Sequence, residues 1–157
     1  MYILGMFFII ILTLADQFSK QMIVNNLALG DCIVVIPNFL ELTHSANTGS
    51  AFGMFAGHTW ILAIVAIITI IALLVFPFKQ IDFKKRIIFS IALILIIAGA
   101  LGNLIDRIFR GEVIDMISFI FGNWRFWTFN FADSYLTIGV ILMLTDMLIG
   151  KNEIWKR

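Results

Sequence analysis

Residues 87–108 read IIFSIALILIIAGALGNLIDRI. The stretch is long enough to cross a membrane, because a hydrocarbon core about 30 Å thick needs about 20 helical residues. Two glycines near its end, Gly99 and Gly102, allow another helix to approach closely. Three polar side chains follow within about one helical turn of each other: Asn103, Asp106 and Arg107. This pattern predicts a membrane helix that carries functional groups near one membrane surface.

The composition of the whole chain also indicates a membrane protein. Its 157 residues are 61% hydrophobic and 13% charged, with a mean hydropathy of +1.02 and a net charge of +1. Soluble domains are about 45–50% apolar and about 25% charged. So few charges cannot cover a water-facing surface, which argues against a cytosolic enzyme, a nucleic-acid binder and a disordered tail. The single cysteine, Cys32, excludes an internal disulfide and a multi-cysteine metal site.

Three further stretches have the length and apolar character of membrane spans. They cover about residues 2–24, 60–76 and 131–149. The prediction is therefore an all-α membrane protein, with four transmembrane helices in a single integral membrane domain, residues 1–157. We expect the first stretch to be retained, since it lacks the basic region and the small-residue cleavage site of a signal peptide.

Basic residues in the short loops predict the orientation of the chain. Seven lie on the side that carries both termini: Lys79, Lys84, Lys85, Arg86, Lys151, Lys156 and Arg157. Four lie on the other side: Lys20, Arg107, Arg110 and Arg125. Because loops rich in lysine and arginine stay in the cytoplasm, we expect both termini to be cytoplasmic.

Two segments are expected on the outer side, at about residues 25–59 and 109–130. In the first, extended runs at 32–36 and 39–43 flank a proline-asparagine turn and predict a small sheet or hairpin. The second segment is too charged and too broken by glycine to cross the membrane. We expect it to form an aromatic loop on the membrane surface, with the rings of Phe119, Phe121, Trp124, Phe126, Trp127 and Phe129.

Two carboxylates carry the sharpest chemical pattern. Asp115 lies inside the apolar run of residues 112–117, and Asp133 lies at the entrance of the fourth predicted helix. Two carboxylates held together near a low-dielectric boundary cannot both ionise, so the pair shares one proton and can activate a water molecule. Asp133 is equally suited to be the N-cap of that helix, and the spacing alone leaves both roles open.

The other ionisable groups lie at the same end of the predicted helices. Asp16 and Lys20 are spaced i, i+4, which suits either an ion pair that anchors the helix or a direct substrate contact. Asn103 and Arg107 offer donors that suit peptide carbonyls or a carboxylate. Asp106 is expected to be mainly structural, either simply as the neighbour of Arg107 or as its partner in a helix-capping network.

Two other interpretations remain open. A divalent metal prefers oxygen ligands, and the available acids are Asp106, Glu112, Asp115 and Asp133. These acids form no compact ligand motif, so we expect no metal and no cofactor. Alternatively, a small transporter or channel requires a polar path, here from Asp16, Lys20, Asp106 and Arg107. A transporter predicts charges near mid-membrane, whereas these charges gather at one end of the helices.

Five sequence blocks, in this order, resemble the lipoprotein signal peptidases, also called signal peptidase II. The blocks are DQFSK at 16–20, NTGSAF at 47–52, GALGNLIDR at 99–107, VID at 113–115 and FNFAD at 129–133. Two positions depart from the pattern. Ala46 stands where many relatives carry arginine, and Ser50 stands where alanine is common.

The resemblance implies a membrane-embedded aspartic endopeptidase that cuts bacterial prolipoproteins just before a diacylglyceryl-modified cysteine. Asp115 and Asp133 would be its catalytic pair. The substrate backbone would be held by Asn47, Asn103, Arg107 and Asn130, and the site would be supported by Asp16, Lys20 and Asp106. The first outer loop would form a small β-cradle.

The expected partners are the prolipoprotein and membrane lipid, with no nucleic acid. We expect a monomer in the bacterial cytoplasmic (inner) membrane, with its active site on the extracytoplasmic side.

Overall fold

A computed structural model describes residues 1–49, 55 and 57–149. Its four long helices are α1 (Tyr2–Asn26), α2 (Thr59–Val75), α3 (Ile87–Phe109) and α4 (Phe131–Ile149), with a short 3-10 helix η2 (Phe78–Gln80). Its four strands are β1 (Cys32–Ile36), β2 (Leu40–Asn47), β3 (Val113–Phe121) and β4 (Trp124–Arg125).

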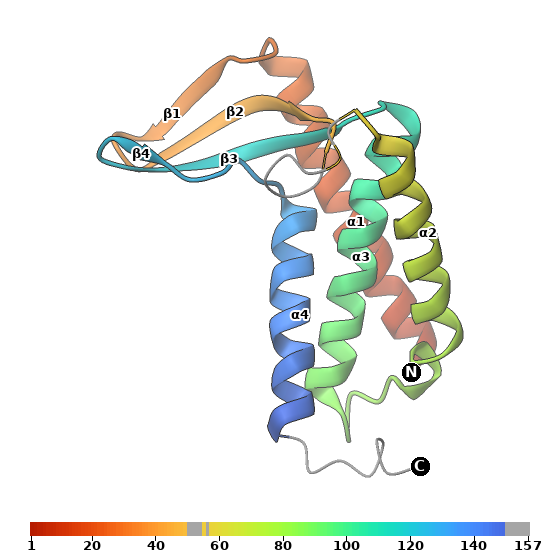
Figure 1. The fold of residues 1–157 in the computed structure, drawn as a ribbon. Helices are drawn as coiled ribbons and strands as arrows, with labels where there is room; N and C mark the ends of the chain where they lie inside the picture. The colour runs from red at the N-terminus through yellow and green to blue at the C-terminus, as the bar shows by residue number, and fades with distance from the viewer. Residues whose placement is uncertain (50–54, 56, 150–157) are drawn as a thin grey trace.

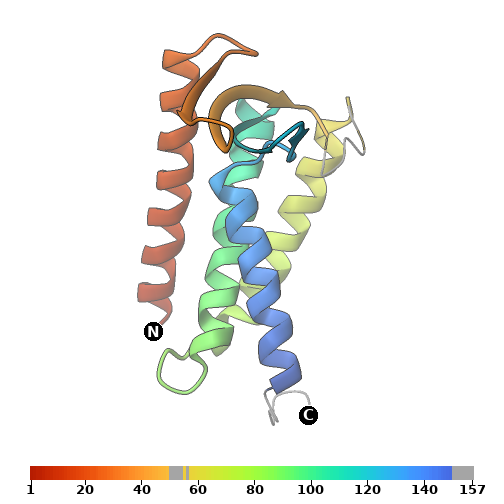
Figure 2. The ribbon, with the colours of Figure 1, turned by 90° about the vertical axis from the view of Figure 1, so that its left-hand side faces the viewer.

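The four predicted membrane helices are confirmed, and each boundary lies within two residues of its prediction. They form a bundle, and the sheet lies across one end of it and projects sideways past α4 (Figure 1). Residue 1 and the last turn of α4 lie at the opposite end, as a view turned by 90° also shows (Figure 2). The bundle therefore has one end that carries the sheet and one end that carries the loop between α2 and α3.

Helix α3 forms the centre of the bundle, and Ala92, Leu93, Ile97 and Ala98 are fully buried along it. Glycine lets α3 and α4 approach closely. A Cβ at Gly99 would collide with the Ala132 carbonyl oxygen, and one at Gly139 would lie 2.8 Å from Ile96 Cγ1. Small residues of this kind are how helices pack inside a membrane, where the hydrophobic effect does not drive them together.

The sheet is antiparallel with strand order β1-β2-β3-β4. The two strands expected in the first outer segment are confirmed, and the second extends to Asn47. The second outer segment differs from expectation, since it contributes β3 and β4 where a loop was expected. The glycines that suggested a loop, Gly111 and Gly122, mark the turns at either end of β3, with φ of 78° and 62°. Left-handed turn positions of this kind favour glycine.

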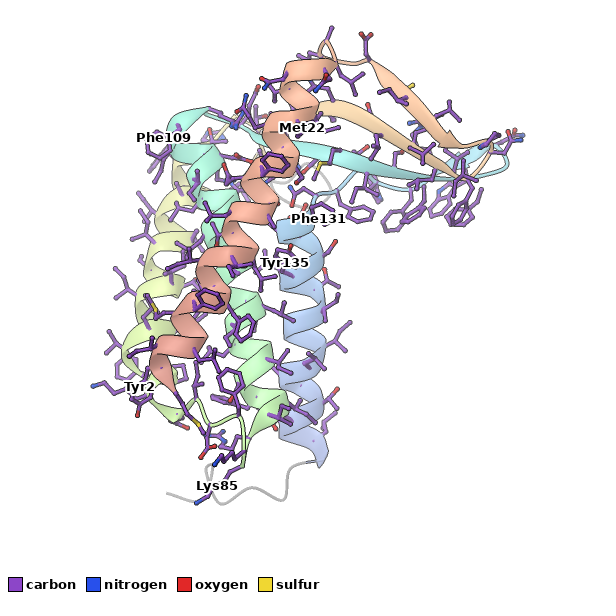
Figure 3. All side chains as sticks on the ribbon, turned by 180° about the vertical axis from the view of Figure 1, so that it is seen from behind. Tyr2, Met22, Lys85, Phe109, Phe131 and Tyr135 are labelled. Carbon is purple, nitrogen blue, oxygen red and sulfur yellow. The ribbon has the colours of Figure 1, made fainter. Side chains whose placement is uncertain are left out.

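The aromatic side chains of this segment form a layer of contacting rings on the sheet. Ring centroids lie 5.2 Å apart between Phe39 and Phe119, 5.9 Å between Phe119 and Phe129, and 5.7 Å between Phe121 and Trp124. A row of rings lies beneath the sheet on the side of the helices (Figure 3). Aromatic rings of this kind favour the membrane–water interface. The aromatic surface predicted for this segment is therefore present, although the segment forms strands where a loop was expected.

Candidate active site

The pairing of β3 with the segment before α4 brings the two aspartates to one place. Asp115 lies on β3, and Asp133 lies in the first turn of α4. The N–H groups of Met116 and Ile117 donate to the Phe129 carbonyl oxygen at 3.0 and 2.8 Å. The Phe129 N–H donates in return to the Ile117 carbonyl oxygen at 3.0 Å. These backbone bonds hold the start of α4 beside the start of β3.

Asn130 connects the two carboxylates directly. It precedes the first residue of α4, and its Oδ1 accepts the Asp133 N–H at 2.8 Å. The Asn130 N–H donates to Asp133 Oδ2 at 3.2 Å, so the two residues form a reciprocal capping arrangement. Asn130 Nδ2 donates to Asp115 Oδ1 at 2.7 Å. Asn130 is therefore the N-cap, the alternative role that the sequence left open for Asp133.

Asn103 holds the other oxygen of Asp133, since its Nδ2 donates to Asp133 Oδ1 at 2.7 Å. Asn103 Oδ1 accepts Lys20 Nζ at 3.1 Å and Asn130 Nδ2 at 3.2 Å. Because an ammonium group can only donate, Lys20 fixes which end of the Asn103 amide is the oxygen. The amide nitrogen must then face Asp133.

Lys20 belongs to a buried ion cluster with Asp16 and Asp106. Its Nζ lies 2.8 Å from Asp16 Oδ2 and 2.8 Å from Asp106 Oδ2, and all three side chains are fully buried. With Asn103, the cluster supplies three acceptors for the three ammonium donors. Asp16 and Lys20 thus form the ion pair that was one of the two roles predicted from their i, i+4 spacing.

The ion cluster also fixes the elements that carry the aspartates. Asp16 Oδ1 accepts the Ala132 N–H in the first turn of α4 at 2.9 Å. Asp106 Oδ2 accepts the Ile114 N–H at 3.3 Å, next to Asp115. Three membrane helices and β3 are thereby joined at one buried point.

Asp106 and Arg107 interact with different partners. Asp106 pairs with Lys20 and with Arg110 Nε (3.3 Å), and among the described residues it forms no ion pair with Arg107. Arg107 instead donates from Nη2 to the Gly49 carbonyl oxygen at 3.2 Å and from Nη1 to its own helix. Its Nε is buried and has no hydrogen-bond partner within the described part of the chain.

Asn47, at the end of β2, holds the second oxygen of Asp115. Its Nδ2 donates to Asp115 Oδ2 at 3.0 Å, and its Oδ1 accepts the Gly49 N–H at 2.9 Å. Of the two positions that depart from the family pattern, Ala46 lines the cavity described below. Ser50 lies outside the described residues.

Both aspartates line a cavity of about 900 Å³ between the sheet and helices α2, α3 and α4. Its polar end also contains Asn47, Asn103 and Arg107. Its walls along the helices are mainly apolar and consist of Leu62, Val65, Ala66, Thr69, Ala100, Leu136 and Thr137. The sheet side contributes Phe126, Trp127 and Phe129. The cavity thus holds a pair of carboxylates at its polar end, and its walls along the membrane helices are mainly apolar.

The pKa of Asp115 is raised to about 7, first by burial and then by the neighbouring charge of Asp133. The hydrogen bonds from Asn47 and Asn130 oppose this rise, because they favour the ionised form. A carboxylic acid that stays protonated near neutral pH, next to a second carboxyl group, is the arrangement required for acid–base catalysis by an aspartate pair.

The other two interpretations can be compared with this geometry. Within residues 1–49, 55 and 57–149, no three or more His, Cys, Asp or Glu side chains are grouped to hold a metal ion. The charges expected to line a transport path include Asp16, Lys20 and Asp106, which are fully buried in the ion cluster.

Three further polar residues at this site were not expected there from the sequence: Gln17, Thr69 and Thr137. Gln17 donates to the Gly102 carbonyl oxygen at 3.0 Å and to Asp106 Oδ1 at 3.3 Å, which joins α1 to α3. Thr69 and Thr137 line the cavity from α2 and α4. In the sequence, Thr69 could have been recognised as the one polar residue within the apolar stretch 60–75.

The chain is similar to known proteins of one family. Residues 8–149 match the family described as signal peptidase (SPase) II. The chain is 40% identical over 138 residues to a lipoprotein signal peptidase of Bacillus pumilus (strain SAFR-032), covering 88% of each chain. It is 41% identical over 150 residues to a lipoprotein signal peptidase of Fusobacterium nucleatum subsp. nucleatum, covering 94% of this chain and 87% of the relative.

Two solved structures have the same fold, and both are described as bacterial membrane enzymes studied by the in meso method. The one at 2.3 Å resolution is 38% identical, with a TM-score of 0.83, and the match covers 95% of this chain and 92% of the other. The one at 1.9 Å resolution is 37% identical, with a TM-score of 0.78 and 94% coverage of both chains. With four membrane helices, a carboxylate pair and these relatives, the chain belongs to the signal peptidase II family of peptidases.

Proposed function

We propose that this protein removes signal peptides from bacterial prolipoproteins, cutting just before a diacylglyceryl-modified cysteine, with Asp115 and Asp133 as the catalytic pair. One observation carries the proposal: Asn130 joins two carboxylates in a cavity whose walls along the membrane helices are mainly apolar. The relatives named lipoprotein signal peptidases support the same substrate.

The reaction begins with the pair holding one proton. The ionised carboxylate takes a proton from a water molecule, whose oxygen bonds to the scissile carbonyl carbon, while the other carboxyl gives its proton to the carbonyl oxygen. The tetrahedral intermediate then breaks its C–N bond. The leaving amine takes the proton that the first carboxylate removed from water, while the second carboxylate takes a proton back from a hydroxyl of the intermediate, which becomes the C=O of the new carboxyl end. The pair then holds one proton again, and the two products separate.

Different residues serve the carboxylates and the substrate. Asn130 is fully buried and Asn103 nearly so, and their amides bind the aspartates, so we assign both to positioning the pair. This differs from the substrate contact expected for them from the sequence. Arg107 and Asn47 lie at the polar end of the cavity, where they can meet the substrate backbone.

The membrane setting suits a substrate that stays in lipid. The signal segment enters between α2 and α4, while the lipid chains of the modified cysteine remain in hydrocarbon. We place the sheet end on the extracytoplasmic side of the cytoplasmic membrane and both termini in the cytoplasm. This follows the four basic residues of the segment between α2 and α3 at the opposite end, which are Lys79, Lys84, Lys85 and Arg86. We propose that the chain acts as a monomer.

The direct test is cleavage of a diacylglyceryl-modified prolipoprotein peptide by Asp115→Asn and Asp133→Asn. Each substitution removes the ability to exchange a proton, so kcat should fall by about a thousandfold or more. Asp146→Asn, the same change at the remote end of α4, is the matched control and should retain activity. Cleavage by either active-site variant at the wild-type rate would rule out the aspartate pair.

Two further measurements in this assay separate the alternatives. Loss of activity on adding a chelator would favour a metal-dependent hydrolase. Equal cleavage of the peptide without its lipid would rule out the proposed substrate.

A further inference from the structure

Helix α2 contains one polar side chain in its apolar interior. Between Trp60 and Val75 every side chain except that of Thr69 is apolar. Thr69 is exposed, and it lines the cavity together with Leu62, Val65 and Ala66. Their spacing puts all four on one helix face. The hydroxyl of Thr69 therefore faces the cavity that also contains the aspartates.

Helix α4 presents a second hydroxyl to the same cavity. Thr137 is exposed in the cavity wall, one turn beyond Asp133 and on the same helix face. Other hydroxyls of α4 are satisfied by their own helix: Ser134 donates to the Asn130 carbonyl at 3.1 Å, and Thr145 to the Ile141 carbonyl at 2.8 Å.

By contrast, the hydroxyl groups of Thr137 and Thr69 make no hydrogen bond with any residue that the structure describes. Both hydroxyl groups are therefore available to polar groups of a ligand that enters the cavity.

A peptide substrate supplies polar groups at this depth. An apolar signal segment crosses lipid as a helix, because every backbone group must be hydrogen-bonded there. A peptidase must unwind the end of that helix to expose the scissile bond. Unwinding frees backbone C=O and N–H groups inside the membrane, each of which costs several kcal/mol if left unpaired.

We infer that the hydroxyls of Thr69 and Thr137 hydrogen-bond the backbone groups that the signal segment frees as it unwinds toward Asp115 and Asp133. This inference rests on the proposed function and adds to it a way of accommodating unwound peptide at membrane depth. A threonine hydroxyl suits this role, because it both donates and accepts and therefore serves a free C=O or a free N–H.

The first experiment measures kcat/KM of Thr69→Val and Thr137→Val on the lipidated peptide. Valine keeps the shape and removes the hydroxyl, so each variant should lose about three- to tenfold. Thr69→Ser and Thr137→Ser restore the hydroxyl and should recover most of the loss. Thr145→Val is the matched control on α4 and should match the wild type. Thermal unfolding of every variant confirms that it is folded.

The second experiment identifies the backbone groups. In a set of lipidated peptides, an ester replaces one backbone amide at a time over the four residues before the scissile bond. An ester has no N–H and is a weaker acceptor than an amide. In the peptide whose ester removes the hydrogen bond to the threonine hydroxyl, Thr→Val should therefore lower kcat/KM by less than it does for the all-amide peptide. A loss that stays the same for all four peptides would overturn the inference.

The two proposals fail in different ways. If the wild-type protein does not cleave the lipidated peptide, the proposed function is wrong. If the wild type cleaves it and both valine variants cleave equally well, the function stands and the role of the hydroxyls is wrong.

Discussion

Asp115 is the residue whose chemistry depends most on its surroundings. It is 4% exposed, and burial together with the charge of Asp133 raises its pKa from 3.8 to about 7. The folded protein therefore holds a proton that the unfolded chain releases between these two pH values. Stability from this group is fully present below about pH 3.8 and is lost as the pH rises to about 7. Keeping a protonated acid at the site thus lowers stability at neutral pH.

The same pKa predicts the pH dependence of cleavage. As the pH rises through about 7, the pair loses its shared proton, so kcat/KM should fall about tenfold per pH unit above that point. The measurement is kcat/KM from pH 5 to about 9, with a peptide that has no ionisable group near the scissile bond. Asp31→Asn, on the outer loop, serves as a control and should keep the same profile. A profile that stays flat to about pH 9 would contradict this assignment.

At the scale of elements, the helices were predictable and one pair of strands was not. An apolar run of about 20 residues has few alternatives to a membrane helix, so all four appeared at their predicted positions. The segment that forms β3 and β4 lacked such a constraint. Its strand character depends on pairing with β2, where Asn47 faces Val113 and Ser45 faces Asp115.

The close packing of α3 against α4 is testable at this scale. Gly99→Ala would place a Cβ against the Ala132 carbonyl and 2.8 Å from Leu136 Cγ, so the free energy of unfolding should fall by about 1–3 kcal/mol. The measurement is denaturant or thermal unfolding in detergent. Gly5→Ala is the control, because its new Cβ would meet the flexible end of Ile81 at 3.1 Å. Equal stability of the two variants would show that α3 and α4 do not depend on this contact.

At the scale of the whole molecule, the two ends of the bundle differ. The sheet lies at one end, and the loop between α2 and α3 lies at the other (Figure 1). The carboxylate pair and the ion cluster belong to the sheet end, since Asp115 lies on β3 and Asp106 accepts the Ile114 N–H of the same strand. Asp82 shows the contrast between the ends. Hydrogen bonds from the Lys84 and Lys85 N–H groups lower its pKa, so this acid remains an ordinary ionised turn residue.

The orientation in the membrane can be measured with the native cysteine. Cys32 is the only cysteine in the sequence, and it is exposed on β1 at the sheet end. A membrane-impermeant maleimide added to intact cells or spheroplasts should label it without permeabilisation. In a Cys32→Ser background, Lys84→Cys at the opposite end should react only after permeabilisation. The reverse pattern would invert the proposed topology.

The sequence by itself determined the spans and the residue types available for chemistry. Membrane helices satisfy their own backbone hydrogen bonds, so local composition is enough to predict them. The ion pair of Asp16 and Lys20 was also local, because one helical turn brings the two side chains together.

Tertiary structure decided which polar groups meet. Asp106 bonds Lys20 of another helix rather than the neighbouring Arg107, and Asn130 takes the cap that spacing left open for Asp133. These contacts join residues far apart in the chain through strand pairing and helix packing. Local propensity does not encode such contacts, because their free energy depends on three-dimensional position.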